Sequence, residues 1–108
     1  MAKVYVVQES PGKNVLGAAD FGTIEILLSS DRQVTFSPGP TVHELNQKLQ
    51  RFSDDDYLVL IGDPVAIGIA CAVAANCNRG RLKVLKWDKQ ECRYYPIQVE
   101  LFTGRGLE

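Results

Sequence analysis

The chain has 108 residues, of which 45% are hydrophobic and 23% are charged, and these proportions are ordinary for a globular protein with a single core. Its formal net charge of −1 gives no general attraction to nucleic acid or to an acidic membrane. The three cysteines lack CxxC spacing, which favours a reducing, cytoplasmic setting over a disulfide framework. We expect one domain over residues 1–106, with Leu107-Glu108 interpreted as a cloning scar.

The first third of the chain is predicted to hold three strands. Residues 3–8 are rich in β-branched and aromatic side chains, and residues 23–28 alternate aliphatic and polar positions. The turn at 29–32 predicts that 33–36 returns as the second strand of a hairpin. Between the first two strands, residues 18–21 are expected to form one helical turn.

The clearest helix start in the sequence follows a Pro- and Gly-rich break at 37–40. Thr41 and Glu44 have the spacing of a capping box, which predicts that the helix begins at Thr41. Its apolar side chains form one narrow stripe, as expected of an amphipathic surface helix: Val42, Leu45, Leu49 and Phe52.

The centre of the chain is strongly apolar. Residues 57–61 form an uninterrupted apolar run, typical of a strand that is covered on both faces. Asp63 is predicted to cap the next helix, with Pro64 at its first position. The helix, expected over 65–75, has no charged residue, so we expect it to be central or to lie at an interface. It is too short to cross a bilayer, which needs roughly 20 residues, so no membrane partner is expected.

Two further strands are predicted near the C-terminus, at 82–87 and 94–101, and Pro96 places the last one at an edge or at a bend. The helix between 57–61 and 82–87 is long enough for a parallel crossover. The predicted fold is therefore an α/β sandwich with a mixed sheet of about five to six strands and two main helices, in the order β-β-β-α-β-α-β-β.

The turn Gly62-Asp63-Pro64 lies at the carboxyl end of a strand, where open α/β sheets bind ligands. It lacks both the GxGxxG and the P-loop patterns, and a capping carboxylate would occupy the place of a bound anion. We therefore favour a helix cap over a phosphate site. If strand 3–8 lies parallel beside 57–61, Lys13 and Asn14 would approach Asp63, which makes these three a candidate ligand site.

The other reactive residue types favour structural interpretations. The acidic run 54–56 would lie roughly 20 Å from Asp63, given the rise of about 3.3 Å per strand residue, so a solvated turn is preferred to a shared metal site. His43, the only histidine, would need a cysteine beside it for nucleophilic chemistry, whereas a free cysteine is more often a small core residue. We predict no catalytic residue, no metal and no cofactor.

Residues 79–93 carry six basic side chains against two acidic ones, interleaved with aromatic residues. Such a hairpin could bind single-stranded nucleic acid by charge and stacking. We prefer the interpretation that the basic residues prevent an exposed sheet edge from pairing with another sheet. We therefore do not expect nucleic acid as a partner. Trp87, Arg93 and Tyr95 remain candidates for a partner or ligand site.

The segments 57–68, 83–88 and 93–96, seen together, resemble a group of short uncharacterised proteins of tailed bacteriophages. The resemblance implies a phage-encoded protein in the host bacterial cytoplasm. It carries no activity onto any residue.

Three functions from different classes remain open. The first is a non-enzymatic accessory protein that acts through protein–protein contacts, as a homodimer formed through the uncharged helix or an edge strand, or with a host or phage protein. The second is a small-ligand or nucleotide-binding enzyme that uses the Gly62-Asp63-Pro64 turn. The third is a single-stranded nucleic-acid binder that uses the 79–93 hairpin.

Overall fold

The computed structural model describes residues 2–13, 15–36 and 38–102. Its five strands form one sheet in the order β2-β1-β3-β4-β5. They are β1 (Lys3–Gln8), β2 (Thr23–Leu28), β3 (Tyr57–Val59), β4 (Arg81–Asp88) and β5 (Arg93–Glu100). Strands β1 to β4 run parallel to one another, and β5 runs antiparallel to β4.

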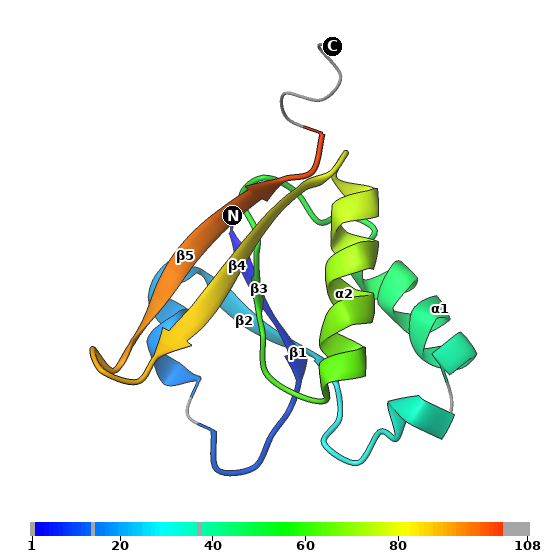
Figure 1. Ribbon diagram of the computed structural model, residues 1–108, viewed down its shortest axis with the longest axis horizontal. Helices are drawn as coiled ribbons and strands as arrows, with labels where there is room; N and C mark the ends of the chain where they lie inside the picture. The colour runs from blue at the N-terminus through cyan, green and yellow to red at the C-terminus, as the bar shows by residue number, and fades with distance from the viewer. Residues whose placement is uncertain (1, 14, 37, 103–108) are drawn as a thin grey trace.

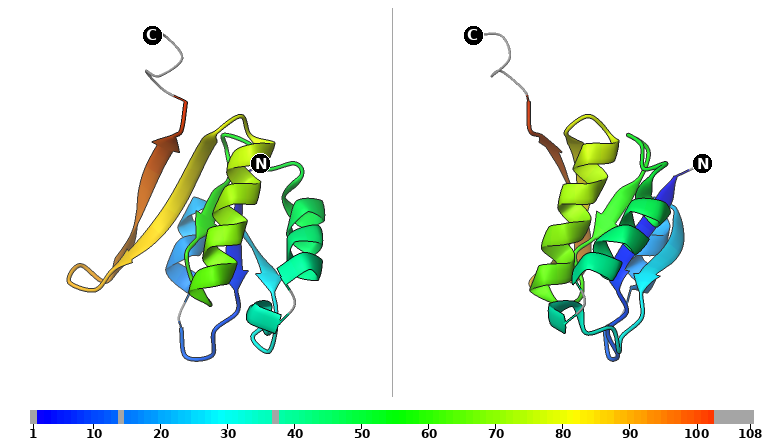
Figure 2. Two further views of the ribbon diagram at one scale, coloured as in Figure 1. Left: turned by 45° about the vertical axis from the view of Figure 1, so that its right-hand side comes forward. Right: turned by 90° about the vertical axis from the view of Figure 1, so that its right-hand side faces the viewer.

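The two main helices are α1 (Pro38–Leu49) and α2 (Pro64–Cys77), and two short 3₁₀ turns, η1 (Leu16–Phe21) and η2 (Val34–Phe36), accompany them. Both helices lie on the same face of the sheet (Figures 1 and 2). The predicted α/β fold with a mixed sheet and two main helices is confirmed, as are the parallel crossover from β3 to β4 and the edge position of the Pro96 strand.

The core has two parts, one on each face of the sheet. On the helix face, side chains of α1 and α2 pack on the sheet, and the most deeply buried residues there include Val7, Leu45, Leu49, Leu58 and Ala70. On the opposite face, Ala18 of η1 packs with Val4, Val6, Val59, Leu85 and Tyr94. The sheet is therefore covered on both sides at its centre, which explains the uninterrupted apolar runs in β1 and β3.

The predicted strand at 33–36 is wrong. These residues include the 3₁₀ turn η2, with Val34 buried and Phe36 82% exposed. The side-chain nitrogen of Gln8 donates hydrogen bonds to the carbonyls of Ser29 and Arg32 at 3.1 Å each. These bonds hold the turn after β2 against β1, and the chain then crosses to α1 instead of folding back along β2.

The predicted start of the first helix is also wrong, because α1 begins at Pro38 rather than at Thr41. Thr41 is fully buried inside the helix, and its hydroxyl accepts a hydrogen bond from Arg32 at 3.3 Å. Glu44 binds Arg32 and Lys48. The two residues of the expected capping box therefore form tertiary contacts that attach α1 to the end of β2.

Helix α2 is apolar on all sides but is not enclosed. Its inner residues are buried: Ala66, Ala70, Val73, Ala74 and Ala75. Its outer residues are exposed: Pro64, Val65, Gly68, Ala72 and Asn76. Of the two expected positions for this helix, central or at an interface, the single chain does not show the central one, because the outer face of α2 is exposed. No helix in the described ranges is both long and apolar enough to cross a membrane.

Candidate functional site

The turn between β3 and α2 is packed tightly against β1. Gly62 has a φ of +128°, and a Cβ there would lie 2.5 Å from the Cβ of Gln8. The Asp63 carboxylate accepts a hydrogen bond from the Val65 N–H at 2.7 Å, so the predicted helix cap is confirmed. The turn therefore requires glycine because the backbone adopts a left-handed conformation and touches its neighbour.

Gln8 occupies the position where a ligand would meet this turn. Its side chain is buried, and its oxygen accepts a hydrogen bond from the Asp63 N–H at 2.9 Å. Its amide nitrogen binds the two carbonyls after β2. One side chain thus joins the carboxyl ends of three neighbouring strands. Sequence reasoning missed Gln8, although a polar residue that ends an apolar strand was a usable signal.

The structure does not bring Lys13 into contact with this turn. Strand β1 does lie parallel beside β3, as the candidate site required. Lys13, however, lines a separate hollow of about 280 Å³ together with Val6 and Ile26, and Val6 belongs to the core on the face opposite the helices. Asn14 lies outside the described residues. The loop after β1 therefore turns toward the face opposite α2.

The acidic run after α1 is used in structural contacts. Asp54 accepts hydrogen bonds from Arg81 and Asn78 at 2.9 Å each, and these partners, Arg81 first, hold its pKa below the usual value. Asp56 is buried and accepts from the N–H groups of Lys3 and Ser53. Over residues 2–13, 15–36 and 38–102, no three His, Cys, Asp or Glu side chains are placed to share a metal ion.

His43 lies on α1, Cys71 and Cys77 lie on α2, and Cys92 lies in the β4–β5 turn. Burial raises the pKa of the Cys71 thiol on α2, the opposite of what a nucleophilic thiolate needs. Cys92 is exposed in the β4–β5 turn. His43 lies on α1, which Figure 1 shows on the opposite side of the molecule from that turn.

The tip of the β4–β5 hairpin gathers three of the candidate residues. Trp87 is 42% exposed and contacts Tyr94 edge to face, with ring centroids 5.0 Å apart. The Arg93 guanidinium lies 4.4 Å from the Tyr95 ring centre and donates to its hydroxyl at 3.0 Å. Trp87 lines two hollows, of about 420 and 430 Å³, one shared with Arg93 and the other with Tyr95.

Part of the basic character of this hairpin serves the fold. Arg81 binds Asp54, and the Lys83 ammonium lies 4.3 Å from the centre of the Tyr57 ring. Lys86 and Lys89 line one of the hollows beside Trp87. Trp87, Arg93 and Tyr95 thus all lie near the hairpin tip, away from Asp63 and Lys13. The strand register places Trp87 with Tyr94 on one face of the hairpin and Arg93 with Tyr95 on the other.

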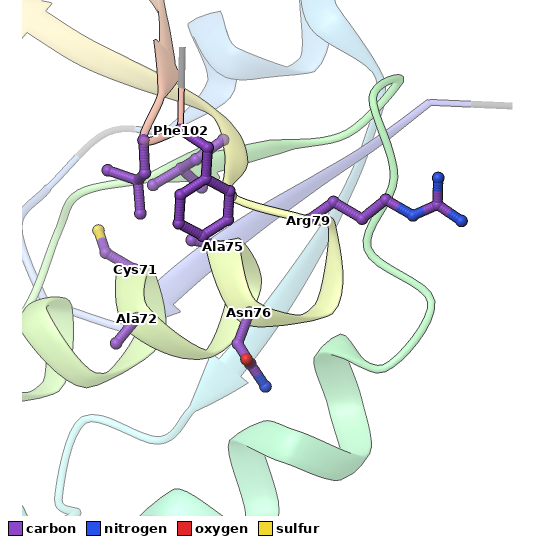
Figure 3. A pocket seen from close by; sticks show the side chains of 9 residues that line it. Cys71, Ala72, Ala75, Asn76, Arg79 and Phe102 are labelled. Carbon is purple, nitrogen blue, oxygen red and sulfur yellow. The ribbon is translucent and has the colours of Figure 1, made fainter. Parts of the chain in front are cut away.

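A third feature lies beside the exposed face of α2. A groove of about 420 Å³, here called the α2 groove, separates the C-terminal half of the helix from the residues after β5 (Figure 3). It is lined by Cys71, Ala72, Ala75, Asn76, Arg79, Gly80, Leu82, Leu101 and Phe102. The polar ends of Asn76 and Arg79 point away from it in Figure 3, so its walls are mainly carbon.

One wall of the groove, the Phe102 ring, packs directly on the backbone of Gly80. Gly80 has a φ of +81°, and a Cβ there would lie 2.7 Å from the Phe102 ring. The ring therefore lies directly over the glycine, at one wall of the groove, while 69% of Phe102 remains exposed. Sequence reasoning missed Leu101 as a surface residue and missed Phe102 entirely, because both follow the last strand without a recognisable pattern.

Comparison with known proteins shows the family to which the chain belongs. A family model described as phage Pam3 gp32-like protein matches residues 2–101. The chain belongs to this family. The Pam3 gp32-like match runs from the residue before β1 to Leu101, so it covers every element of the fold and most of the α2 groove, and it confirms the resemblance to phage proteins. No curated protein and no solved structure matches the chain.

Proposed function

We propose that this Pam3 gp32-like protein is a non-enzymatic phage accessory protein that acts through protein–protein contacts and associates with a second copy of itself. The contact is formed by the α2 surface, which consists of three exposed residues in the middle of the outer face of α2 and the two exposed residues after β5: Val65, Gly68, Ala72, Leu101 and Phe102. The observation that carries the proposal is an uncharged helix of 14 residues with an outer face in solvent.

The composition of this face supports an interface. A helix on the surface of a monomeric protein normally has charged residues on its outer side, and α1 follows that rule with His43, Gln47 and Lys48 exposed. In α2, by contrast, Val65 is 50% exposed and no residue from 64 to 77 is charged. An exposed helix face without a charged residue is unusual for a monomeric protein and favours an interaction site.

The contacts at the carboxyl edge of the sheet support a non-enzymatic role. The Gly62-Asp63-Pro64 turn is the position where an α/β enzyme would be expected to bind its ligand. Here Gln8 fills the space against Gly62, and the Asp63 carboxylate accepts the Val65 N–H. These contacts leave the α2 surface as the better supported site.

The molar mass of variants in solution tests the proposal. A charge at Ala72, in the middle of the exposed face, should prevent close apposition of two apolar surfaces. Light scattering after size exclusion should give twice 12.0 kDa for the wild type and the single-chain mass for Ala72→Glu. The matched control is Gln47→Glu on the exposed side of α1, which should remain dimeric. A single-chain mass for the wild type, or dimers of Ala72→Glu, would overturn the proposal.

The hairpin tip is a second candidate, as a single-stranded nucleic-acid site. The specific observation is the exposed Trp87 with a hollow on either side and with Lys86 and Lys89 beside it, since base stacking on an aromatic ring combined with phosphate contacts is how such sites work. Trp87 is the only tryptophan, so quenching of its fluorescence by an oligothymidylate reports binding directly. Quenching that weakens as salt rises would support this candidate, and no quenching at low salt would remove it.

A further inference from the structure

We infer that two copies pack their α2 helices antiparallel about a twofold axis near Ala70, so that Val65 of each copy enters the α2 groove of the other. This inference rests on the self-association proposed above and specifies its geometry. It names a second copy of this chain as the occupant of the groove. Three separate features of the chain fit this one arrangement.

The first feature is the centre of the exposed face. In an antiparallel helix pair centred near residue 70, facing residues have numbers that add up to about 140, so Gly68 faces the partner's Ala72. A Cβ at Gly68 would meet no heavy atom within 4 Å in the single chain. Glycine is the least favourable helix residue after proline, and no contact within the chain requires it at this position. Close approach of a second helix would require a residue without a side chain.

The second feature is the match between a protruding side chain and a hollow. Val65 lies one turn before Gly68 and is 50% exposed. The same register places it opposite the partner's Ala75 and Asn76, and both residues line the α2 groove. The groove, of about 420 Å³ with mainly carbon walls, is large enough for a branched aliphatic side chain. Twofold symmetry repeats the contact, so both grooves would be filled.

The third feature is charge complementarity at the two ends of the helix. Asp63 precedes α2 and Arg79 follows it, with no charged residue between them. In the antiparallel register Asp63 faces the partner's Arg79 at both ends, whereas parallel helices would place like charges together. Within the described residues Arg79 is exposed and forms no ion pair, and its guanidinium points away from the groove (Figure 3). Antiparallel packing also aligns the helix dipoles favourably.

Disulfide trapping between two different copies tests the register. In a background with Cys71, Cys77 and Cys92 replaced by serine, one preparation carries Val65→Cys and the other carries Asn76→Cys, two exposed positions that leave Gly68 intact. A disulfide requires Cα atoms within about 7 Å of each other. When the two preparations are mixed and mildly oxidised, the antiparallel register predicts at least fivefold more 65–76 cross-link than 65–65 cross-link, resolved by mass. Parallel helices would reverse this preference.

A charge reversal provides an independent measurement. Arg79→Glu would place a carboxylate against the partner's Asp63, and the dimer dissociation constant should rise at least tenfold. Adding Asp63→Asn, which keeps a helix-capping side chain, should restore at least half of that loss on a logarithmic scale. Arg51→Glu, at an exposed position after α1, is the control and should leave the constant unchanged.

The outcomes separate this inference from the proposed function. Dimers that form no preferred 65–76 cross-link, or that tolerate Arg79→Glu without weakening, overturn the antiparallel register and leave self-association standing. A background protein and a wild type that are both monomeric overturn the self-association on which the register rests. The preferred cross-link together with rescue by Asp63→Asn supports the register.

Discussion

The side-chain oxygen of Gln8 lies 2.9 Å from the backbone nitrogen of Asp63 and accepts its hydrogen bond. This contact connects the end of β1 to the start of α2 across 55 residues of sequence. It lies at the edge where the strands of an α/β sheet end and where ligands are usually bound. In this molecule the Gln8 side chain packs into that edge against Gly62, which is one reason for placing the proposed contact on the α2 surface.

Replacing Gln8 by leucine should destabilise the fold substantially. The substitution leaves the Asp63 N–H and the carbonyls of Ser29 and Arg32 without their partner, and an unsatisfied buried group costs about 1–3 kcal/mol. We expect a loss of about 3 kcal/mol in the free energy of unfolding, measured by chemical denaturation. Gln98→Leu, at an exposed position of β5, should change it by less than about 0.5 kcal/mol. Equal effects of the two changes would contradict the assigned role of Gln8.

Gly62 should not tolerate a side chain. Alanine at this position would adopt a φ of +128° with its Cβ 2.5 Å from that of Gln8, and strain together with overpacking costs about 3 kcal/mol. Thermal unfolding should therefore shift downward by several degrees in Gly62→Ala. The control is Gly39→Ala in α1, where a Cβ meets nothing within 4 Å and no loss is expected. A fully stable Gly62→Ala protein would show that the turn is not packed as described.

Asp56 should be far more sensitive than its neighbour Asp55. The buried Asp56 carboxylate acts only as a hydrogen-bond acceptor, and its partners include the backbone N–H groups of Lys3 and Ser53. Asparagine would turn an NH₂ group toward one of these donors, so Asp56→Asn should lower the free energy of unfolding by about 2 kcal/mol. Asp55 is exposed, and Asp55→Asn should cost less than about 0.5 kcal/mol. The two denaturation midpoints give the comparison, and coincident midpoints would refute it.

Glu44 should contribute stability that is lost in acid. Hydrogen bonds from Lys48 and then from Arg32 lower the pKa of Glu44 below its ordinary value of 4.5. Because the pKa is lower in the folded chain, the stabilisation is fully present above about pH 4.5 and disappears as the pH falls through the folded-state pKa. The difference in melting temperature between wild type and Glu44→Gln should therefore shrink from pH 6 to pH 3. A difference that stays constant over this range would exclude the linkage.

Sequence patterns predicted the elements whose signal is local. The β-branched run of β1, the cap at Asp63 and the antiparallel β4–β5 pair all depend on residues close together in the chain. The strand expected at 33–36 failed for a different reason. Its apolar residues suit a strand, but the Gln8 amide holds the preceding turn from across the sheet, and no local pattern reports such a contact.

Predictions of the candidate sites also depended on whether the signal was local in the sequence or came from distant contacts. Trp87, Arg93 and Tyr95 belong to one predicted hairpin, and the structure places all three near its tip. The strand register puts Trp87 on one face of the hairpin and the Arg93–Tyr95 pair on the other. Lys13 was expected near Asp63 from strand order, which was correct, but the direction of the loop after β1 was not encoded in that order. Phe102 was missed because its importance comes from lying over Gly80, 22 residues earlier.

Sedimentation equilibrium of the wild-type protein tests the central claim most directly, because it measures whether the chain associates with a second copy of itself. The proposed self-association predicts a molar mass that rises with concentration from 12.0 kDa toward twice that value. A mass that stays at 12.0 kDa up to the highest concentration attainable would contradict it.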